Sequence, residues 1–112
     1  MHRIIETINE GIIGDTMRFY HGTSIRNLKG IIKKGIIDGY ISPMKDGAKA
    51  YAIQSWEYGE DGILVVLDIP MKALRIILEY QIEDIKTEWE FQILEPIDKR
   101  YIIRIDKFMN KL

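Results

Sequence analysis

The spacing of apolar residues predicts helices in the first half of the chain. Near the N-terminus, apolar positions recur at mostly three- and four-residue intervals, at Ile4, Ile5, Ile8, Ile12 and Ile13. This spacing predicts a short amphipathic helix over residues 2–10, ended by Gly11 and Gly14. A second helix is expected after Thr23 or Ser24, because either hydroxyl can cap the first free amides of a helix. The stripe that this helix would bury consists of Ile25, Leu28, Ile31 and Ile32.

Residues after this stripe indicate where the second helix ends and a third begins. Lys33 and Lys34 suit the negative end of the helix dipole. Gly35 is expected to adopt the left-handed conformation that commonly terminates helices. A third helix is expected to begin near Asp46 and to carry Ala48, Ala50, Tyr51 and Ala52.

Runs of apolar and β-branched residues predict strands between and after these helices. Residues 63–69 are almost entirely apolar, as in a central buried strand, and Pro70 ends the run. Turn-forming residues precede it at 58–62. The predicted strands cover residues 16–21, 36–42, 63–69, 75–80, 88–94 and 101–106. Helices in the first half and strands in the second predict an α+β fold, with one domain over residues 1–112.

Composition and charge narrow the function classes without selecting one. The 112 residues are 46% hydrophobic and 29% charged, as in an ordinary globular domain. A net charge of −1 gives no overall basic footprint for nucleic acid. The absence of cysteine excludes disulfides and thiolate metal sites, and no metal is expected. Because we find neither a membrane-length apolar run nor a signal-peptide pattern, we expect a cytoplasmic protein without a membrane partner.

Two positions stand out as candidate chemistry. His21 and Gly22 lie where a predicted strand meets a predicted helix, where a side chain can reach into a cleft and a ligand can approach the glycine backbone. The alternative is that His21 and Thr23 only satisfy local hydrogen bonds. Glu88 and Glu90 would share one face of a strand, with Trp89 and Phe91 on the buried face. A carboxylate face of this kind is also common as a solvated sheet surface.

Several short motifs, taken in their order and spacing along the chain, resemble those of a known family, although no single one of them is decisive. The positions are His21-Gly22-Thr23 after a strand, Gly39-Tyr40-Ile41-Ser42, Ala48-Lys49-Ala50-Tyr51, Glu88-Trp89, and Ile97 with Tyr101–Ile105. Together they resemble the ADP-ribosyltransferase fold of the His-Tyr-Glu type, shared by poly(ADP-ribose) polymerases and diphtheria-like toxins. The resemblance covers residues 17–106 and implies a split antiparallel β-sandwich with two to three short helices. The chain departs from the polymerases in its short loops and in Ala48, which replaces a helix serine.

The resemblance implies a mono-ADP-ribosyltransferase that uses NAD as co-substrate. It assigns the nicotinamide ribose and carboxamide to His21 and Gly22, with Thr23 beside them, and the nicotinamide ring to Tyr40 and Tyr51. His21 would donate a hydrogen bond to a ribose hydroxyl. Breaking the glycosidic bond develops positive charge on the ribose, which a fixed carboxylate stabilises. Glu88 is the preferred catalytic carboxylate because Trp89 follows it. Glu90 stays the alternative, as a catalytic or acceptor-orienting group.

The acceptor and the activity itself stay open at the level of sequence. The segment over residues 81–87 is acidic, which is compatible with a basic protein side chain. Arg26, Lys29, Lys33 and Lys34 could form a basic face suited to NAD phosphates or nucleic acid, so both a protein and a nucleic-acid acceptor are retained. One alternative function is a non-catalytic nucleotide-binding or interaction domain of the same fold. Another is an RNA 2′-phosphotransferase, which would need a further basic set that the two histidines do not supply.

Overall fold

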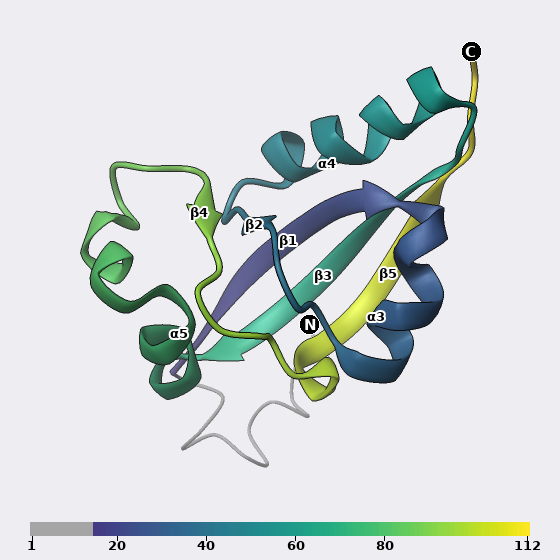
Figure 1. Ribbon diagram of the computed structural model, residues 1–112. Coiled ribbons are helices and arrows are strands. Elements are labelled where there is room, and N and C mark those ends of the chain that lie inside the picture. Colours follow the sequence, from purple (N-terminus) through teal and green to yellow (C-terminus); the bar gives the residue numbers. More distant parts are fainter. Residues whose placement is uncertain (1–14) are drawn as a thin grey trace, which may run out of the picture.

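The computed structural model describes residues 15–112. These residues contain a three-stranded antiparallel sheet. The helix expected over residues 2–10 lies outside these residues. The sheet has the strand order β1 (Thr16–Ser24), β3 (Gly62–Pro70) and β5 (Ile102–Phe108) (Figure 1). Strands expected over residues 16–21, 63–69 and 101–106 are therefore confirmed. The expected central strand is β3, whose side chains from residue 62 to 67 are all buried.

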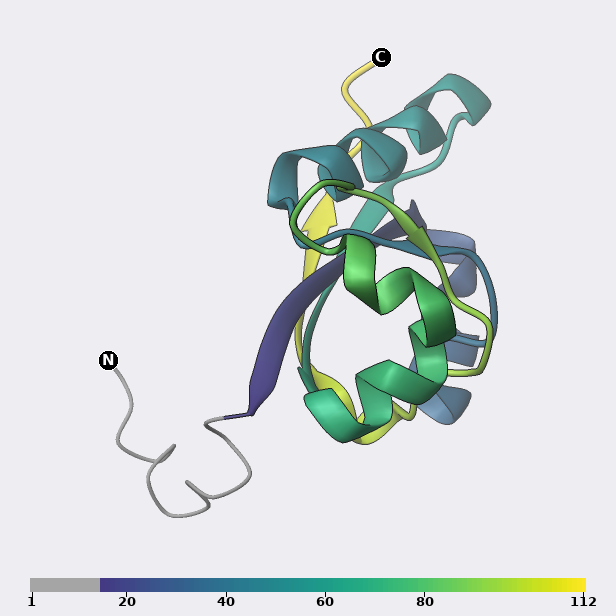
Figure 2. The ribbon, with the colours of Figure 1, turned by 90° about the vertical axis from the view of Figure 1, so that its left-hand side faces the viewer.

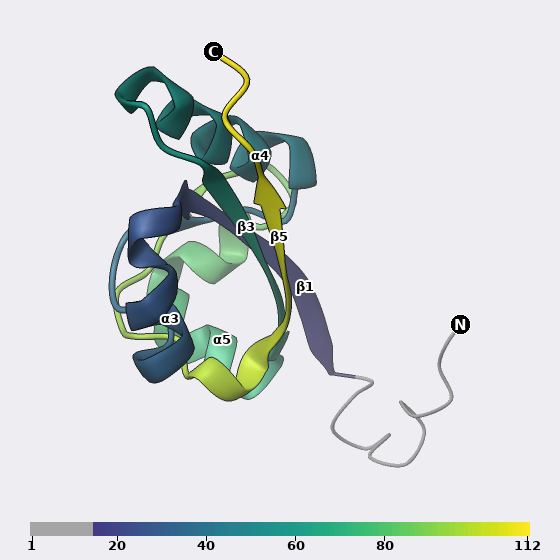
Figure 3. The ribbon, with the colours of Figure 1, turned by 90° about the vertical axis from the view of Figure 1, so that its right-hand side faces the viewer.

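Helices cover the sheet on both faces. Helices α3 (Leu28–Lys34) and α5 (Met71–Leu78) lie on one side, at the left of Figure 3, and α4 (Lys45–Gln54) lies over the end of the sheet. The core lies on the side of α3 and α5, where Phe19 meets Phe91 edge-to-face, with ring centroids 6.4 Å apart. The described residues thus form an α+β fold with three α-helices and two small antiparallel sheets, which confirms the α+β part of the prediction.

Helix α4 approaches the sheet closely because glycine and alanine meet at the contact. A Cβ built on Gly22 would lie 1.7 Å from the carbonyl oxygen of Ala48, and one on Gly62 would lie 2.0 Å from that of Ala52. Ala48 and Ala52 are themselves buried. Gly22 is therefore required by packing, since the backbone of α4 occupies the space of any side chain there.

The second sheet pairs β2 (Tyr40–Ile41) with β4 (Phe91–Gln92). It joins the larger sheet through Ser42, whose backbone exchanges hydrogen bonds of 2.8 and 2.9 Å with Tyr20 of β1. A further bridge joins Ile36 to Ile97. The α4 helix confirms the helix expected near Asp46.

The strand expected over residues 75–80 is wrong. These residues belong to α5 and to the 3-10 helix η3 (Glu79–Asp84), which lie in front in Figure 2. Leu74, Ile77 and Leu78 are buried at the spacing of one helical face, whereas Ile76 is exposed. The apolar residues therefore follow the 3.6-residue period, which the prediction missed because the run is short and rich in isoleucine.

Three finer predictions are also corrected. The strand expected over residues 88–94 contains only Phe91 and Gln92, and Trp89 is 61% exposed instead of buried. Ile32 is 58% exposed, because α3 has only seven residues and turns Ile31 to the core. Gly35 has φ 84° and ψ −161°, which is not the left-handed helical conformation. Its Cβ would lie 2.1 Å from the Ile97 carbonyl oxygen, so the bridge beside it demands glycine.

Among residues 15–112, no helix has the length and apolarity needed to cross a bilayer.

The remaining connections are short. A 3-10 helix, η1 (Ile25–Asn27), links β1 to α3, and η2 (Ser55–Tyr58) links α4 to the turn before β3. A last one, η4 (Lys99–Tyr101), leads into β5.

Candidate ligand-binding site

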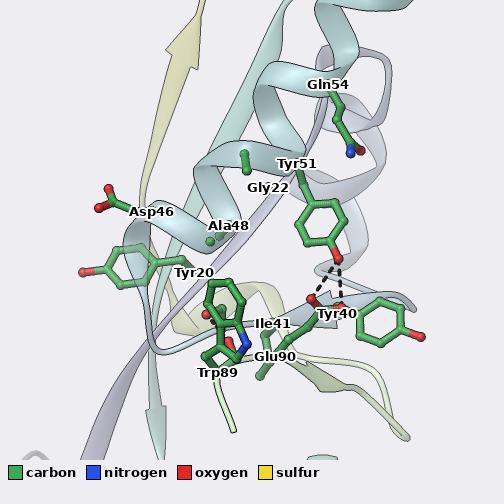
Figure 4. Close-up of a pocket in the computed structure, with 13 residues that line it drawn as sticks. Tyr20, Gly22, Tyr40, Ile41, Asp46, Ala48, Tyr51, Gln54, Trp89 and Glu90 are labelled. Carbon is green, nitrogen blue, oxygen red and sulfur yellow. Dashed lines mark hydrogen bonds between the residues drawn. The ribbon is translucent and has the colours of Figure 1, made fainter.

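A cavity of about 390 Å³ opens between α4, β1, β2 and the loop that leads into β4 (Figure 4). This volume falls within the range of roughly 300–1,000 Å³ that is usual for small-molecule sites. Aromatic rings and two carboxylates dominate the lining, and no lysine, arginine or histidine among residues 15–112 contributes to it. The lining side chains that matter below are Tyr20, Tyr40, Asp46, Tyr51, Trp89 and Glu90. Such a lining favours a ligand group that is planar and positively charged.

Tyr51 and Glu90 meet across the mouth of this cavity. The Tyr51 hydroxyl, on α4, donates to the Glu90 carboxylate and lies 2.9 Å from each carboxylate oxygen (Figure 4). This hydrogen bond raises the pKa of Tyr51, because ionising the phenol would place a second negative charge beside Glu90. The contact joins the third helix of the sequence prediction to the loop before β4.

The structure brings together four of the predicted site residues. Gly22, Tyr40, Tyr51 and Glu90 all line the cavity. Glu88 does not line it and lies exposed in the loop, with its backbone amide donating to the Asp84 carbonyl at 2.8 Å. From the sequence, Glu90 was only the alternative to Glu88 as the catalytic carboxylate. A signal for it was available, since Glu90 is followed by the aromatic Phe91 just as Glu88 is followed by Trp89.

Backbone groups of Gly22 face the open edge of β1. Alternate residues of an antiparallel strand present their N–H and C=O groups to opposite edges. Tyr20 uses its pair for Ser42, so the pair of Gly22, two residues on, lies on the same edge just beyond that bridge. One donor and one acceptor side by side match the two hydrogen-bonding groups of a carboxamide.

A second cavity, of about 550 Å³, lies on the opposite face of β1. Adjacent residues of a strand point to opposite faces, so His21 and Thr23 line this cavity whereas Tyr20 and Gly22 line the first. Its lining includes the cations Arg26 and Lys34, with Asp38 opposing them. Lys29 and Lys33, the other members of the predicted basic face, do not contribute.

A shallower hollow of about 260 Å³ connects the two cavities. It shares Gly22 and Tyr51 with the first cavity, and Thr23 and Arg26 with the second. The Arg26 guanidinium also pairs with Glu60 at 2.8 Å, which lowers the pKa of Glu60. The three hollows thus adjoin one another around β1, and together we call them the groove along β1; one end is aromatic and acidic, and the other contains Arg26 and Lys34.

The hydrogen bond of His21 fixes its tautomer. Nδ1 lies 2.7 Å from the backbone oxygen of Tyr40, and a carbonyl oxygen only accepts, so Nδ1 carries the proton. Desolvation lowers the pKa of His21, although the bond to Tyr40 opposes this shift. In the neutral ring Nε2 is then an acceptor. This tautomer therefore presents an acceptor at Nε2, whereas the resemblance implied that His21 donates.

The sequence left open whether Thr23 or Ser24 caps the helical segment after β1. Ser24 caps η1 by accepting from the Arg26 amide at 3.2 Å, whereas Thr23 accepts from the Asn27 side chain at 2.8 Å. Ser42 and Asp46 also line the first cavity. The sequence patterns included Ser42 in a motif and Asp46 as a helix start but assigned neither to a site, because their position in the cavity depends on how β2 and α4 pack against β1.

Neither cavity offers a metal site by its side chains. Within residues 15–112, no three histidine, aspartate or glutamate side chains gather as metal ligands would. Comparison with known proteins adds no assignment, since no protein-family model and no curated protein matches the chain.

Proposed function

We propose that the protein is an NAD-dependent mono-ADP-ribosyltransferase in which Glu90 supplies the catalytic carboxylate. One observation carries the proposal, the groove along β1 that joins an aromatic, acidic cavity to a basic one. NAD has the same order of charges, with a pyridinium cation at one end and a diphosphate in the middle, between the two riboses. The resemblance in the order of His21, Tyr40, Tyr51 and a late glutamate supports the same reaction class.

In this proposal the nicotinamide occupies the first cavity. The rings of Tyr40 and Tyr51 attract the pyridinium by cation–π contact, and the Gly22 backbone pairs with the carboxamide. His21 accepts from a ribose hydroxyl through Nε2. The diphosphate extends along the hollow toward Arg26, whose planar guanidinium suits phosphate oxygens.

The reaction breaks the bond between the ribose C1′ and the nicotinamide nitrogen. The bonding pair leaves with nicotinamide, which becomes neutral, and positive charge develops on the ribose. A fixed carboxylate stabilises that charge, so Glu90 lowers the barrier. The acceptor then forms a bond to C1′ and releases its proton to solvent or to Glu90. Because stacking weakens as the ring loses its charge, Tyr40 and Tyr51 position the substrate and do not stabilise the transition state.

Glu90 is preferred over Glu88 on geometry. Both glutamates are exposed, but Glu90 lines the cavity and contacts Tyr51, whereas Glu88 does not line the cavity. The two glutamates are separated by one residue and have the same side chain. They therefore form a matched pair in which only the placement differs.

The test is release of nicotinamide from NAD, measured with water or a cell lysate supplying acceptors. The wild-type protein is expected to release nicotinamide, and Glu90→Gln to release it about 10²- to 10³-fold more slowly. Glu88→Gln, the matched control, should stay within about threefold of wild type. Full activity of Glu90→Gln, or a loss confined to Glu88→Gln, would overturn the assignment. Absence of release from the folded wild-type protein would overturn the function itself.

A second function is favoured by one contact. Tyr51 engages both oxygens of Glu90, which is compatible with a domain of this fold that binds a nucleotide without turning it over. Calorimetry distinguishes the two functions. NAD binding without nicotinamide release would support the non-catalytic domain.

A further inference from the structure

Ser42 has a buried side chain at a junction of three segments. It is 5% exposed and follows β2 directly. Its backbone pairs with Tyr20 of β1, its hydroxyl accepts from the Met44 amide at 2.9 Å, and the same hydroxyl donates to the carbonyl oxygen of Trp89. Ser42 thus connects three segments: its backbone pairs with the sheet, and its hydroxyl joins the entry to α4 to the loop before β4.

Trp89 is held from a second direction, by its ring. A Cβ built on Gly47 would lie 3.3 and 3.5 Å from two atoms of the indole, so the ring lies directly against the first turn of α4. Yet Trp89 is 61% exposed. Burial in a core therefore does not fix this residue. Its position depends on the Ser42 hydroxyl at the backbone and on Gly47 at the ring.

Glu90 follows Trp89 immediately, and its carboxylate accepts from the Tyr51 hydroxyl on α4. Upstream, the loop folds back on itself, with the amides of Thr87 and Glu88 donating to the Asp84 carbonyl. Downstream, regular pairing begins at Phe91, in β4. Trp89 is thus where the loop is fastened to the cavity wall, one residue before the carboxylate.

We propose that Ser42 is a positioning residue, which holds Trp89 and thereby sets the Glu90 carboxylate over the reacting ribose. The inference rests on the proposed function and adds to it the element that places the carboxylate. A displacement of about 1 Å in a catalytic group can reduce a rate about 10²-fold. Releasing one of the two contacts that hold Trp89 is therefore expected to affect turnover more than substrate binding, because Tyr40, Tyr51 and Gly22, the groups proposed to bind nicotinamide, stay unchanged.

The test compares nicotinamide release by wild type, Ser42→Ala and Ser42→Thr. We expect Ser42→Ala to lower kcat about 10- to 100-fold and to change the KM for NAD by less than about threefold. Ser42→Thr, which keeps the hydroxyl, should retain more activity than Ser42→Ala. Thr87→Ala is the matched control. It removes a hydroxyl in the same loop, which donates to the Asp84 carbonyl oxygen at 3.2 Å, and it should leave kcat unchanged.

A second readout separates positioning from general stability. The pKa of Tyr51, followed by nuclear magnetic resonance of its ring carbon, is raised by contact with Glu90 and should fall toward its ordinary value in Ser42→Ala. Gly47→Ala, which presses on the indole, provides a second variant and should also lower kcat. Folded Ser42→Ala protein with wild-type kcat, or with a change confined to KM, would overturn the inference. Lack of release by wild type would instead overturn the proposed function.

Discussion

Substituting Gly22 by alanine tests the closest contact in the fold. The new Cβ would lie 1.7 Å from the Ala48 carbonyl oxygen and 3.0 Å from the Ala52 amide nitrogen. Restoring an ordinary contact of roughly 3.5 Å would require α4 to move by about 2 Å. The obstructing atoms belong to helix backbone, so no side-chain rotation relieves the clash.

The expected cost follows from this geometry. Overpacking a close-packed contact typically costs about 1–3 kcal/mol, and we expect Gly22→Ala to cost about 3 kcal/mol because a whole helix must shift. For a domain of this size, that loss lowers the melting temperature on the order of 15 °C. Urea denaturation, with the midpoint and the slope both fitted, measures the loss directly.

Gly30→Ala is the matched control. Gly30 lies within α3, and a Cβ there would meet nothing within 4 Å. The same substitution should therefore stabilise the protein, by about 0.5–1 kcal/mol, because alanine favours helix over glycine. Equal stability of Gly22→Ala and wild type would refute the packing of α4 on β1, and so would an equal loss in both variants.

Two further outcomes are expected. Desolvation lowers the pKa of His21, so at mildly acidic pH this histidine is protonated in the unfolded chain but neutral in the folded one. The free energy of unfolding should therefore fall as pH drops below about 6.5, before carboxylates such as Glu60 titrate. His21→Gln should show a smaller fall in the urea midpoint between pH 7 and 5.5, and an unchanged fall would contradict a neutral His21. NAD should bind about tenfold more tightly than NADH in calorimetry, because only the oxidised ring is a cation for Tyr40 and Tyr51. Equal affinities would contradict a pyridinium site.

Local sequence patterns were sufficient to predict strands β3 and β1 and helix α4. The run at β3 is apolar throughout, and only a central strand covered on both faces buries such a run. Strand β1 and helix α4 were expected from a strand pattern and from a cluster of alanines. The helix α5 was missed, although Leu74, Ile77 and Leu78 have helical spacing, because β-branched isoleucines weighed more than the period.

The candidate site was only partly predictable. The alternation of a strand already implies that His21 and Gly22 point to opposite faces, and hence that a ligand contacting both must cross β1. Sequence alone did not separate Glu88 from Glu90, since an aromatic residue follows each and their placement depends on a loop and not on the assumed strand. Ser42 could not be predicted either, because its role arises from contacts with Tyr20 and Trp89, which are distant in sequence.

The most direct measurement of the central claim is a structure of the protein with NAD, or with an analogue that resists cleavage. We expect the nicotinamide ring to lie against Tyr51, within about 4 Å of the Glu90 carboxylate, and the diphosphate to lie beside Arg26. His21 should accept from a ribose hydroxyl through Nε2. NAD bound in the opposite direction, or away from the groove along β1, would contradict the account.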